Sequence, residues 1–266
     1  LTFSKIKIAH IEGGELSGTV DEMIRHSVTK LSHIHFVTNN AAKKVLINSG
    51  EKKENIFVTG SPDIDFLNKS LRPKIKEVKK KYDINFDNYA ISFLHPVTTQ
   101  TKKENKRNAE IYFSCLLKMK KLNIVQFVPN NDDHSLVILT TLNKILKKKN
   151  NVKILRSMRF EHYLTLLENS QFIIGNSSSA IMEAPYFNVP AINIGDRQLN
   201  RHRVNSTINS SFVQREIFNS IKRVKNIILN KKQIFGRGDS AKKIIRILKS
   251  KNFKNLQLQK LYKNLK

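Results

Sequence analysis

The sequence predicts an α/β fold with parallel sheets, because strand-like and helix-like segments alternate along most of the chain. Short runs rich in β-branched residues are separated by longer amphipathic segments, a pattern typical of βαβ units with right-handed crossovers. Several of the runs end in glycine or in the break His95-Pro96. These endings place irregular loops at the carboxyl ends of the strands, where such sheets bind ligands.

The expected strands are short and apolar, and the expected helices repeat apolar residues at three- and four-residue intervals. In chain order the strands are Ile6–Ala9, Ile34–Val37, Ile56–Thr59, Tyr89–Leu94, Ile124–Val128, Val152–Leu155, Phe172–Ile174 and Ala191–Ile194. The helices are 21–31, 39–49, 103–121, 134–149, 159–169, 179–187 and 214–229, with a lysine-rich helix between the first three strands and the rest.

The order of these elements predicts two Rossmann-like domains, of which the first is incomplete. Residues 1–66 hold only three strands and two helices, so we expect them to be the C-terminal half of a domain. Residues 67–236 hold a full alternation and are expected to form a whole Rossmann-like domain, while 237–266 form a helical tail. We therefore expect a segment to be missing before Leu1.

The composition is strongly basic, with 48 Lys+Arg against 21 Asp+Glu and a formal net charge of +27. The lysines follow helix-like stretches with apolar residues at helical spacing, which is typical of solvated helix faces. No zinc-ligand set, helix-turn-helix or RNA-binding aromatic motif accompanies the charge, so we expect no nucleic-acid partner. A general attraction for anionic ligands, including nucleotides, is the other interpretation.

Other counts limit the class of protein further. No apolar run reaches the roughly 18 residues of a membrane span, so no membrane partner is expected. The single cysteine, Cys115, excludes an intrachain disulfide and fits a reducing compartment, which predicts a cytoplasmic protein. No metal-ligand spacing stands out, and neither a metal nor a cofactor is expected.

The sharpest chemical motif is the turn Gly175-Asn176 followed by Ser177, Ser178 and Ser179. It comes after a buried-type strand and is expected to open a helix whose amino end, with its free N–H groups and hydroxyls, would seat a phosphate. A serine cap on an ordinary helix is the alternative. Two further features favour a nucleoside diphosphate: Glu183, placed to accept from sugar hydroxyls, and the arginines Arg197, Arg201 and Arg203 after the next strand.

A second set of polar residues follows the first strand. Glu12 precedes the pair Gly13-Gly14, which lets backbone approach a ligand closely, so Glu12 is expected in a cleft where it could act as an acid. Asp21 and Arg25 are four residues apart on one helix face and could pair, either in a site or as an ordinary surface ion pair. In the second expected domain, His95 could donate a hydrogen bond to a phosphate or to a leaving oxygen, or it could simply pack within its loop.

Taken in order, these motifs resemble the UDP-N-acetylglucosamine 2-epimerase family, and most closely its hydrolysing branch in sialic and legionaminic acid synthesis. The likeness runs over about residues 6–248 and rests on HIEGGE (10–15), DEMIRH (21–26), SHIHFV (32–37), VTGSPDID (58–65), HPVT (95–98), GNSSS (175–179), EAP (183–185) and NIGDRQ (193–198).

The resemblance implies a glycosyltransferase-B-like fold, a UDP-sugar substrate and a homodimer. It implies that Ser177 and its neighbours hold the diphosphate, Glu183 the ribose, and Arg197 or Arg201 the phosphates. Glu12 and Asp21 match acidic positions that transfer protons or hold the sugar, Arg25 matches the paired arginine, and His95 the histidine near the leaving diphosphate. The family's first βα units, with a basic residue and a further aspartate, have no counterpart here, so we expect little activity from these 266 residues alone.

Two alternatives remain open from the sequence. A glycosyltransferase of the same fold would share the serine turn, although the acidic set Glu12 and Asp21 with Arg25 favours an epimerase. A basic nucleic-acid-binding protein would present its lysine faces as one continuous stripe. The sequence does not distinguish UDP-N-acetylglucosamine from a UDP-diacetamido sugar.

Overall fold

The computed structural model describes residues 5–67, 69–201, 205–227, 229, 234–250, 253 and 255–260. The chain divides into two compact units. Unit 1 comprises 1–68 and 233–266, and unit 2 comprises 69–232. The segment 237–266, expected as a tail, belongs to unit 1. No described helix is long and apolar enough to cross a membrane.

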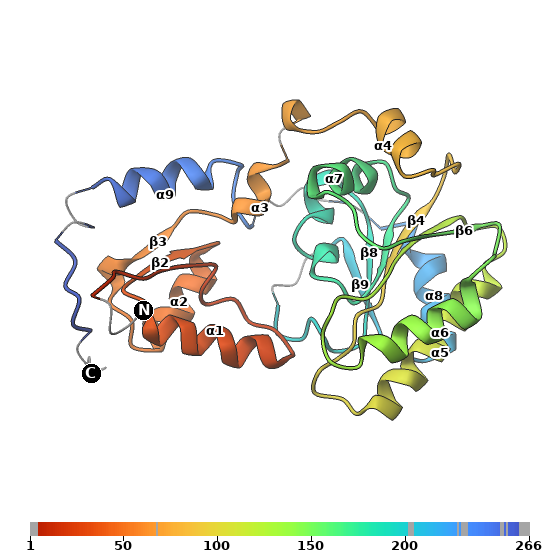
Figure 1. Ribbon diagram of the computed structural model, residues 1–266, viewed down its shortest axis with the longest axis horizontal. Helices are drawn as coiled ribbons and strands as arrows, with labels where there is room; N and C mark the ends of the chain where they lie inside the picture. The colour runs from red at the N-terminus through yellow and green to blue at the C-terminus, as the bar shows by residue number, and fades with distance from the viewer. Residues whose placement is uncertain are drawn as a thin grey trace. The chain divides into compact units, whose positions relative to one another are not determined.

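Unit 1 has a parallel sheet in the order β1-β2-β3, and β1 lies at its edge (Figure 1). Its elements are β1 (Ala9–Ile11), α1 (Val20–Leu31), β2 (Ile34–Val37), α2 (Asn40–Asn48), a 3₁₀ turn (Lys53–Asn55), β3 (Ile56–Val58), α3 (Pro62–Asp65) and α9 (Ser240–Leu248). Apolar residues of β2 and β3 pack against α2 on one side, and others of β2 pack with α9.

Helix α9 begins far along the chain from the residue that caps it. The Asp65 carboxylate accepts hydrogen bonds from the Ser240 backbone N–H (2.9 Å), the Ser240 hydroxyl (2.8 Å) and the Ala241 N–H (2.8 Å). The backbone N–H groups among these donors belong to the first turn of the helix, where no carbonyl within the helix is placed to accept from them. Asp65 therefore joins α9 to α3, and the two helices lie side by side in Figure 1.

We expect Asp65→Ala to lower the free energy of unfolding of unit 1 by about 1–2 kcal/mol, as loss of a helix cap does. Hydrogen exchange of the α9 amides should accelerate in parallel. The exposed Glu54→Ala in the same unit is the control and should change neither measurement. Unchanged urea unfolding and unchanged α9 exchange in Asp65→Ala would show that the cap does not hold α9.

Unit 2 is a doubly wound α/β domain with a six-stranded parallel sheet in the order β6-β5-β4-β7-β8-β9. Its elements are a 3₁₀ turn (Lys69–Leu71), α4 (Ile75–Lys81), β4 (Ala90–Phe93), α5 (Lys102–Lys118), β5 (Ile124–Phe127), α6 (Ser135–Leu146), β6 (Val152–Leu155), α7 (Phe160–Glu168), β7 (Ile173–Gly175), two 3₁₀ turns (Ser178–Ala180 and Ala184–Phe187), β8 (Ala191–Ile194), β9 (Thr207–Ser210) and α8 (Gln214–Val224). Helices α5, α6 and α8 share the main hydrophobic core with the sheet.

The strand order places a topological switch point between β4 and β7. From β4 the chain builds outward through β5 and β6, then returns to add β7, β8 and β9 on the other side. In sheets of this kind the loops at the carboxyl ends of the two central strands separate to opposite faces and leave a crevice for ligands. Here those loops begin at Leu94 and Asn176.

Two sequence expectations about elements were wrong, and one element of the structure was not expected. The first strand is Ala9–Ile11 instead of Ile6–Ala9, because the Ile8 N–H donates to Nδ1 of His33 (3.0 Å) in place of a strand carbonyl. The helix expected at 179–187 is absent, and two 3₁₀ turns stand in its place. Serine hydroxyls compete for the backbone donors there and Pro185 lacks one. The edge strand β9 was not expected.

Candidate functional site

The two loops at the switch point of unit 2 are joined by the side chain of Asn176, which is fully buried. Its Oδ1 accepts from the His95 backbone N–H (2.7 Å) and its Nδ2 donates to the His95 carbonyl (2.7 Å). The Asn176 carbonyl in turn accepts from Nε2 of Gln198 (3.0 Å) and Nη1 of Arg197 (3.3 Å). Polar residues that follow β4, β7 and β8 therefore meet at one edge of the sheet.

Gly175 allows this meeting, because no other residue fits between β7 and β4. Its φ is +134°, and a Cβ added there would lie 1.6 Å from the carbonyl oxygen of Phe93, its partner across the ladder. The backbone of β7 thus runs directly against that of β4, and Asn176 follows at bonding distance from His95.

The three serines do not begin an α-helix: Ser177 caps a 3₁₀ turn that Ser178 and Ser179 open, so the expected helix dipole is not available to a phosphate. The turn itself is well ordered by local bonds. The Ser177 hydroxyl accepts from the Ser179 N–H (3.3 Å), and the Ser179 hydroxyl bonds to the hydroxyl of buried Tyr163. Ser177 and Ser178 remain partly exposed, so their hydroxyls are the donors of the turn that solvent can reach, while the N–H groups of Ser179 and Ala180 bond within the turn.

Glu183 lies buried near the same tyrosine. The pKa of Tyr163 is raised far above its ordinary value, first by burial and then by the negative charge of Glu183, while the bond to Ser179 opposes the rise. Tyr163 therefore stays neutral and can orient the Ser179 hydroxyl as donor or acceptor.

His95 is held as a neutral imidazole. Burial, and then the positive charge of Arg197, lower its pKa from 6.5 to about 4, against the opposing charge of Asp132. Its Nδ1 accepts from the Asn130 backbone N–H (3.0 Å), so the ring proton resides on Nε2. The ring stacks on Phe93, with centroids 5.7 Å apart. His95 thus offers a neutral N–H donor, and the cationic charge at this edge comes from Arg197.

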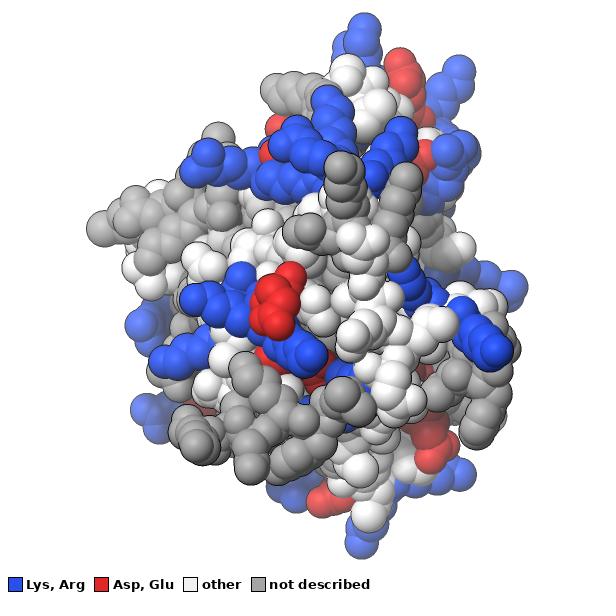
Figure 2. All heavy atoms as spheres, turned by 90° about the vertical axis from the view of Figure 1, so that its left-hand side faces the viewer, with Lys and Arg blue, Asp and Glu red and all other residues white. Residues whose placement is uncertain are grey.

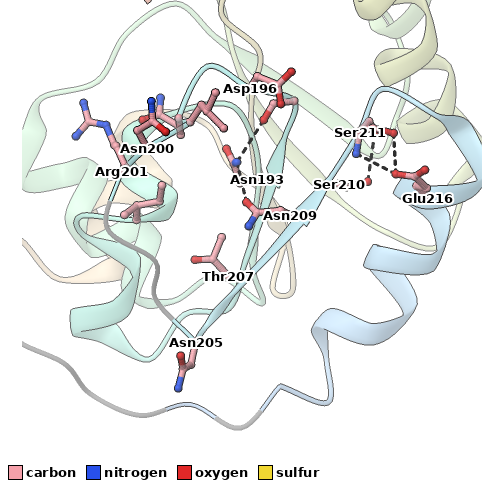
Figure 3. A pocket seen from close by; sticks show the side chains of 14 residues that line it. Asn193, Asp196, Asn200, Arg201, Asn205, Thr207, Asn209, Ser210, Ser211 and Glu216 are labelled. Carbon is pink, nitrogen blue, oxygen red and sulfur yellow. Dashed lines mark hydrogen bonds between the residues drawn. The ribbon is translucent and has the colours of Figure 1, made fainter. Parts of the chain in front are cut away.

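The two predicted arginines have different surroundings. Arg197 pairs with Asp132 (3.5 Å) beside Asn176, whereas Arg201 contacts the sulfur of Met182 (3.4 Å). Arg201 also lines a cavity of about 540 Å³ that runs along β9 beside the loop after β8, shown in Figure 3. There Asn193 and Asn209 point toward each other and hydrogen-bond (2.9 Å). Arg203 lies outside the described residues.

In unit 1 the polar residues gather where its three strands end. Glu12 follows β1 with φ at +63°, a conformation uncommon for a residue with a side chain. Its N–H still extends the ladder to the Phe36 carbonyl (2.8 Å), and its Oε1 accepts from the hydroxyl of Ser61, just after β3. Strained backbone held by neighbouring structure is frequent at functional sites.

The neighbours of Glu12 complete a carboxylate-rich edge. Glu15 is buried and accepts from the hydroxyl of Thr38, the residue after β2. Asp21 and Arg25 do not pair as the sequence suggested. Arg25 instead donates to the Glu15 carbonyl (2.9 Å), and exposed Asp21 accepts from the Thr19 hydroxyl (3.0 Å). The structure thus connects Arg25 to the Glu12–Glu15 loop and leaves Asp21 at the surface.

Sequence reasoning missed the residues that organise both edges. Asn176, Asn130, Gln198 and Tyr163 in unit 2, with Ser61 and Thr38 in unit 1, were not proposed as site residues. Ser61 and Thr38 follow predicted strands, so their position alone could have pointed to them. Within the described parts of the chain, no cluster of three or more His, Cys, Asp and Glu side chains could hold a metal ion.

The depressed pKa of His95 predicts how unit 2 responds to acid. An unfolded histidine binds its proton below about 6.5, whereas folded His95 does so only near 4. The unfolded state therefore gains protons first, and stability should be complete above pH 6.5 and fall as the pH drops from 6.5 toward 4. In His95→Gln, the free energy of unfolding of unit 2, measured in urea, should therefore fall less steeply between pH 6.5 and pH 4. An imidazole ¹⁵N titration that places His95 near 6.5 would contradict the prediction.

Comparison with known proteins gives a consistent result. A sequence model of the family described as UDP-N-acetylglucosamine 2-epimerase matches residues 2–249. The UDP-N-acetylglucosamine 2-epimerase of Neisseria meningitidis serogroup B is 44% identical over 214 residues, which are 80% of this chain and 56% of that protein. The UDP-N,N'-diacetylbacillosamine 2-epimerase (hydrolyzing) of Legionella pneumophila is 31% identical over 254 residues, 92% of this chain and 65% of that one.

A solved structure supports the same likeness. The Methanocaldococcus jannaschii UDP-GlcNAc 2-epimerase, solved in complex with UDP-GlcNAc and UDP, superposes with a TM-score of 0.79 at 25% identity. The match covers 93% of this chain and 70% of that one. The chain thus spans a little over half to about two thirds of the length of the curated relatives described here.

Proposed function

Because the chain belongs to the UDP-N-acetylglucosamine 2-epimerase family, we propose that it is the main part of a hydrolysing 2-epimerase acting on a UDP-N-acetylhexosamine. Its two units with parallel sheets have the glycosyltransferase-B-like fold that the family resemblance implied. The observation that carries the proposal is the meeting of three groups suited to an anion at the switch point of unit 2: the serine turn, neutral His95 and Arg197.

We assign the nucleotide to unit 2. The partly exposed hydroxyls of Ser177 and Ser178 and the Arg197 guanidinium suit a diphosphate, which accepts hydrogen bonds and carries negative charge. Arg201, farther along the same loop, is the second candidate for the phosphates. The carboxylate of Glu183 suits the ribose, because it can accept hydrogen bonds from the ribose hydroxyls. The Nε2–H of His95 would donate to the departing phosphate oxygen without itself losing or gaining charge.

The proposed reaction has two steps. A base removes the proton from C2 of the sugar while the C1–O bond breaks, its electron pair leaving with UDP, and a 2-acetamidoglucal forms. Water then adds its oxygen to C1, and a proton reaches C2 from the opposite face, giving the free 2-epimer of the ManNAc type. By the family likeness we assign Glu12 and Asp21, with Arg25, to proton transfer and to holding the sugar. Of the two carboxylates, Glu12 is the one held at the strand ends of unit 1, whereas Asp21 lies exposed on α1.

Two observations favour this reading over the alternatives. The family match and the carboxylate edge of unit 1 favour an epimerase over a glycosyltransferase of the same fold. On the face shown in Figure 2, the described Lys and Arg side chains gather in groups with Asp and Glu side chains among them, which is typical of solvated surfaces. The homodimer and the cytoplasmic location stay predictions.

The products formed in deuterated water test the proposal. The full-length gene product should convert UDP-N-acetylglucosamine or UDP-N,N'-diacetylbacillosamine to UDP and a free 2-epimer that carries deuterium at C2. NMR of the reaction mixture detects both products. The two substrates compared side by side identify the sugar. A product still attached to UDP would contradict the hydrolysing type, and a free sugar without deuterium at C2 would contradict the elimination route.

A further inference from the structure

The loop that carries His95 is irregular, and it is held from two sides by buried asparagines. It runs from Leu94 to Thr101 between β4 and α5 and contains no helix or strand. Loops of this length are ordinarily mobile unless their backbone groups find partners. In this loop the backbone groups of His95 and Val97 are both taken up by amide side chains.

The two asparagines bind the loop in the same way. Asn176 accepts from the N–H of His95 and donates to its carbonyl, both at 2.7 Å. Asn105, on α5, accepts from the N–H of Val97 (2.9 Å) and donates to the Val97 carbonyl (3.1 Å). Each carboxamide thus bonds to both the N–H and the carbonyl of a single residue, as the backbone of a neighbouring β-strand would. Both are almost fully buried, so water does not compete for these bonds.

The ring of His95 is fixed by the same arrangement. With its backbone held by Asn176 and the residue beyond Pro96 held by Asn105, the imidazole reaches the Asn130 N–H through Nδ1 at 3.0 Å. That bond selects the tautomer with the proton on Nε2. The Asn176 carbonyl also accepts from Arg197, so one residue orders both the neutral donor and the cation.

We propose that Asn105 and Asn176 are positioning residues that hold His95 in the orientation and tautomer needed to donate to a phosphate. The proposal rests on the proposed function for the identity of the ligand, but the state of the His95 ring can be measured without any ligand. Asparagine is required at both places because only a carboxamide supplies a donor and an acceptor on one short planar group.

The test combines imidazole ¹⁵N NMR with UDP affinity in the 266-residue chain. The wild type should show His95 in a single Nε2–H tautomer. Asn176→Ala and Asn105→Ala should each give averaged tautomers and weaken UDP binding about tenfold, as misplacement of a contact group does. Asn151→Ala is the control. It removes a donor to the Leu122 carbonyl (2.8 Å) elsewhere on the same sheet and should change neither result.

A double-mutant cycle separates positioning from general damage. If Asn176 acts through His95, then Asn176→Ala should add little to the loss of UDP affinity already caused by His95→Ala. Additive losses, or a single unchanged tautomer in both asparagine variants, would overturn the proposal. Should Asn176→Ala fail to fold, Asn105→Asp keeps the acceptor for Val97 and removes the donor, and it should average the tautomers too. A wild type that shows the tautomer but binds no UDP would refute the proposed function alone.

Discussion

Replacing Gly175 with alanine should destabilise unit 2 by about 3 kcal/mol or more, or prevent it from folding. The new Cβ would lie 1.6 Å from the Phe93 carbonyl oxygen, far inside van der Waals contact, and φ at +134° is a conformation that side chains rarely adopt. Relief requires β7 to separate from β4, which would break the ladder at the centre of the sheet.

Urea unfolding measures this effect, and a second glycine provides the control. Gly50 also has a positive φ, +88°, but the nearest atom to its added Cβ is Nζ of Lys30 at 3.8 Å. Gly50→Ala should therefore cost only about 1 kcal/mol, the strain of the backbone conformation alone. Gly50 belongs to unit 1, so each loss is measured for its own unit, and similar losses would show that the close approach of β7 to β4 adds nothing to the cost of the backbone conformation.

The 266-residue chain by itself should turn over UDP-N-acetylglucosamine at least about 100-fold more slowly than the neisserial relative assayed beside it. The family likeness implies a basic residue and an aspartate in βα units that have no counterpart here, and loss of one acid–base group costs about that factor. The chain spans 56% of that relative. UDP should still bind, because the groups assigned to the diphosphate all lie in unit 2.

The comparison uses equal concentrations of the two proteins and measures by NMR the rate at which each releases UDP from the sugar nucleotide. The neisserial enzyme assayed with and without added chain controls for inhibitors in the preparation. Turnover by the chain equal to that of the relative would contradict the prediction, and it would assign every group needed for the reaction to these 266 residues.

Much of the fold follows from local sequence pattern, and the exceptions have identifiable physical causes. Short apolar runs were enough to predict β2 to β8, because burial on both faces of a parallel sheet leaves a clear apolar signal. The helices between these strands were also predicted, except between β7 and β8, where two 3₁₀ turns stand in place of the expected helix. The first strand shifted because a histidine side chain, His33, took a backbone donor. The short edge strand β9 carries alternating polar residues that resemble a loop.

The candidate site divides in the same way. The serine turn and His95 were predictable from their place after apolar strands, although the helix expected after the serines did not form. The bonds that organise them were not predictable. Asn176 and His95 are 81 positions apart, and their pairing depends on β7 lying next to β4, which the order of strands along the chain does not reveal. Likewise Glu12 and Ser61 meet only because β1 and β3 end at the same edge.

The central claim is that unit 2 binds a UDP-sugar through the residues at its switch point, and a titration of UDP followed by backbone amide NMR tests it most directly. The account predicts saturable shifts at Ser177, Ser178 and Arg197 and at the His95 ring, with Ser177→Ala weakening the binding. Absence of binding would contradict it. So would shifts confined to the cavity around Asn193 and Asn209, because the nucleotide would then occupy a place other than the one assigned here.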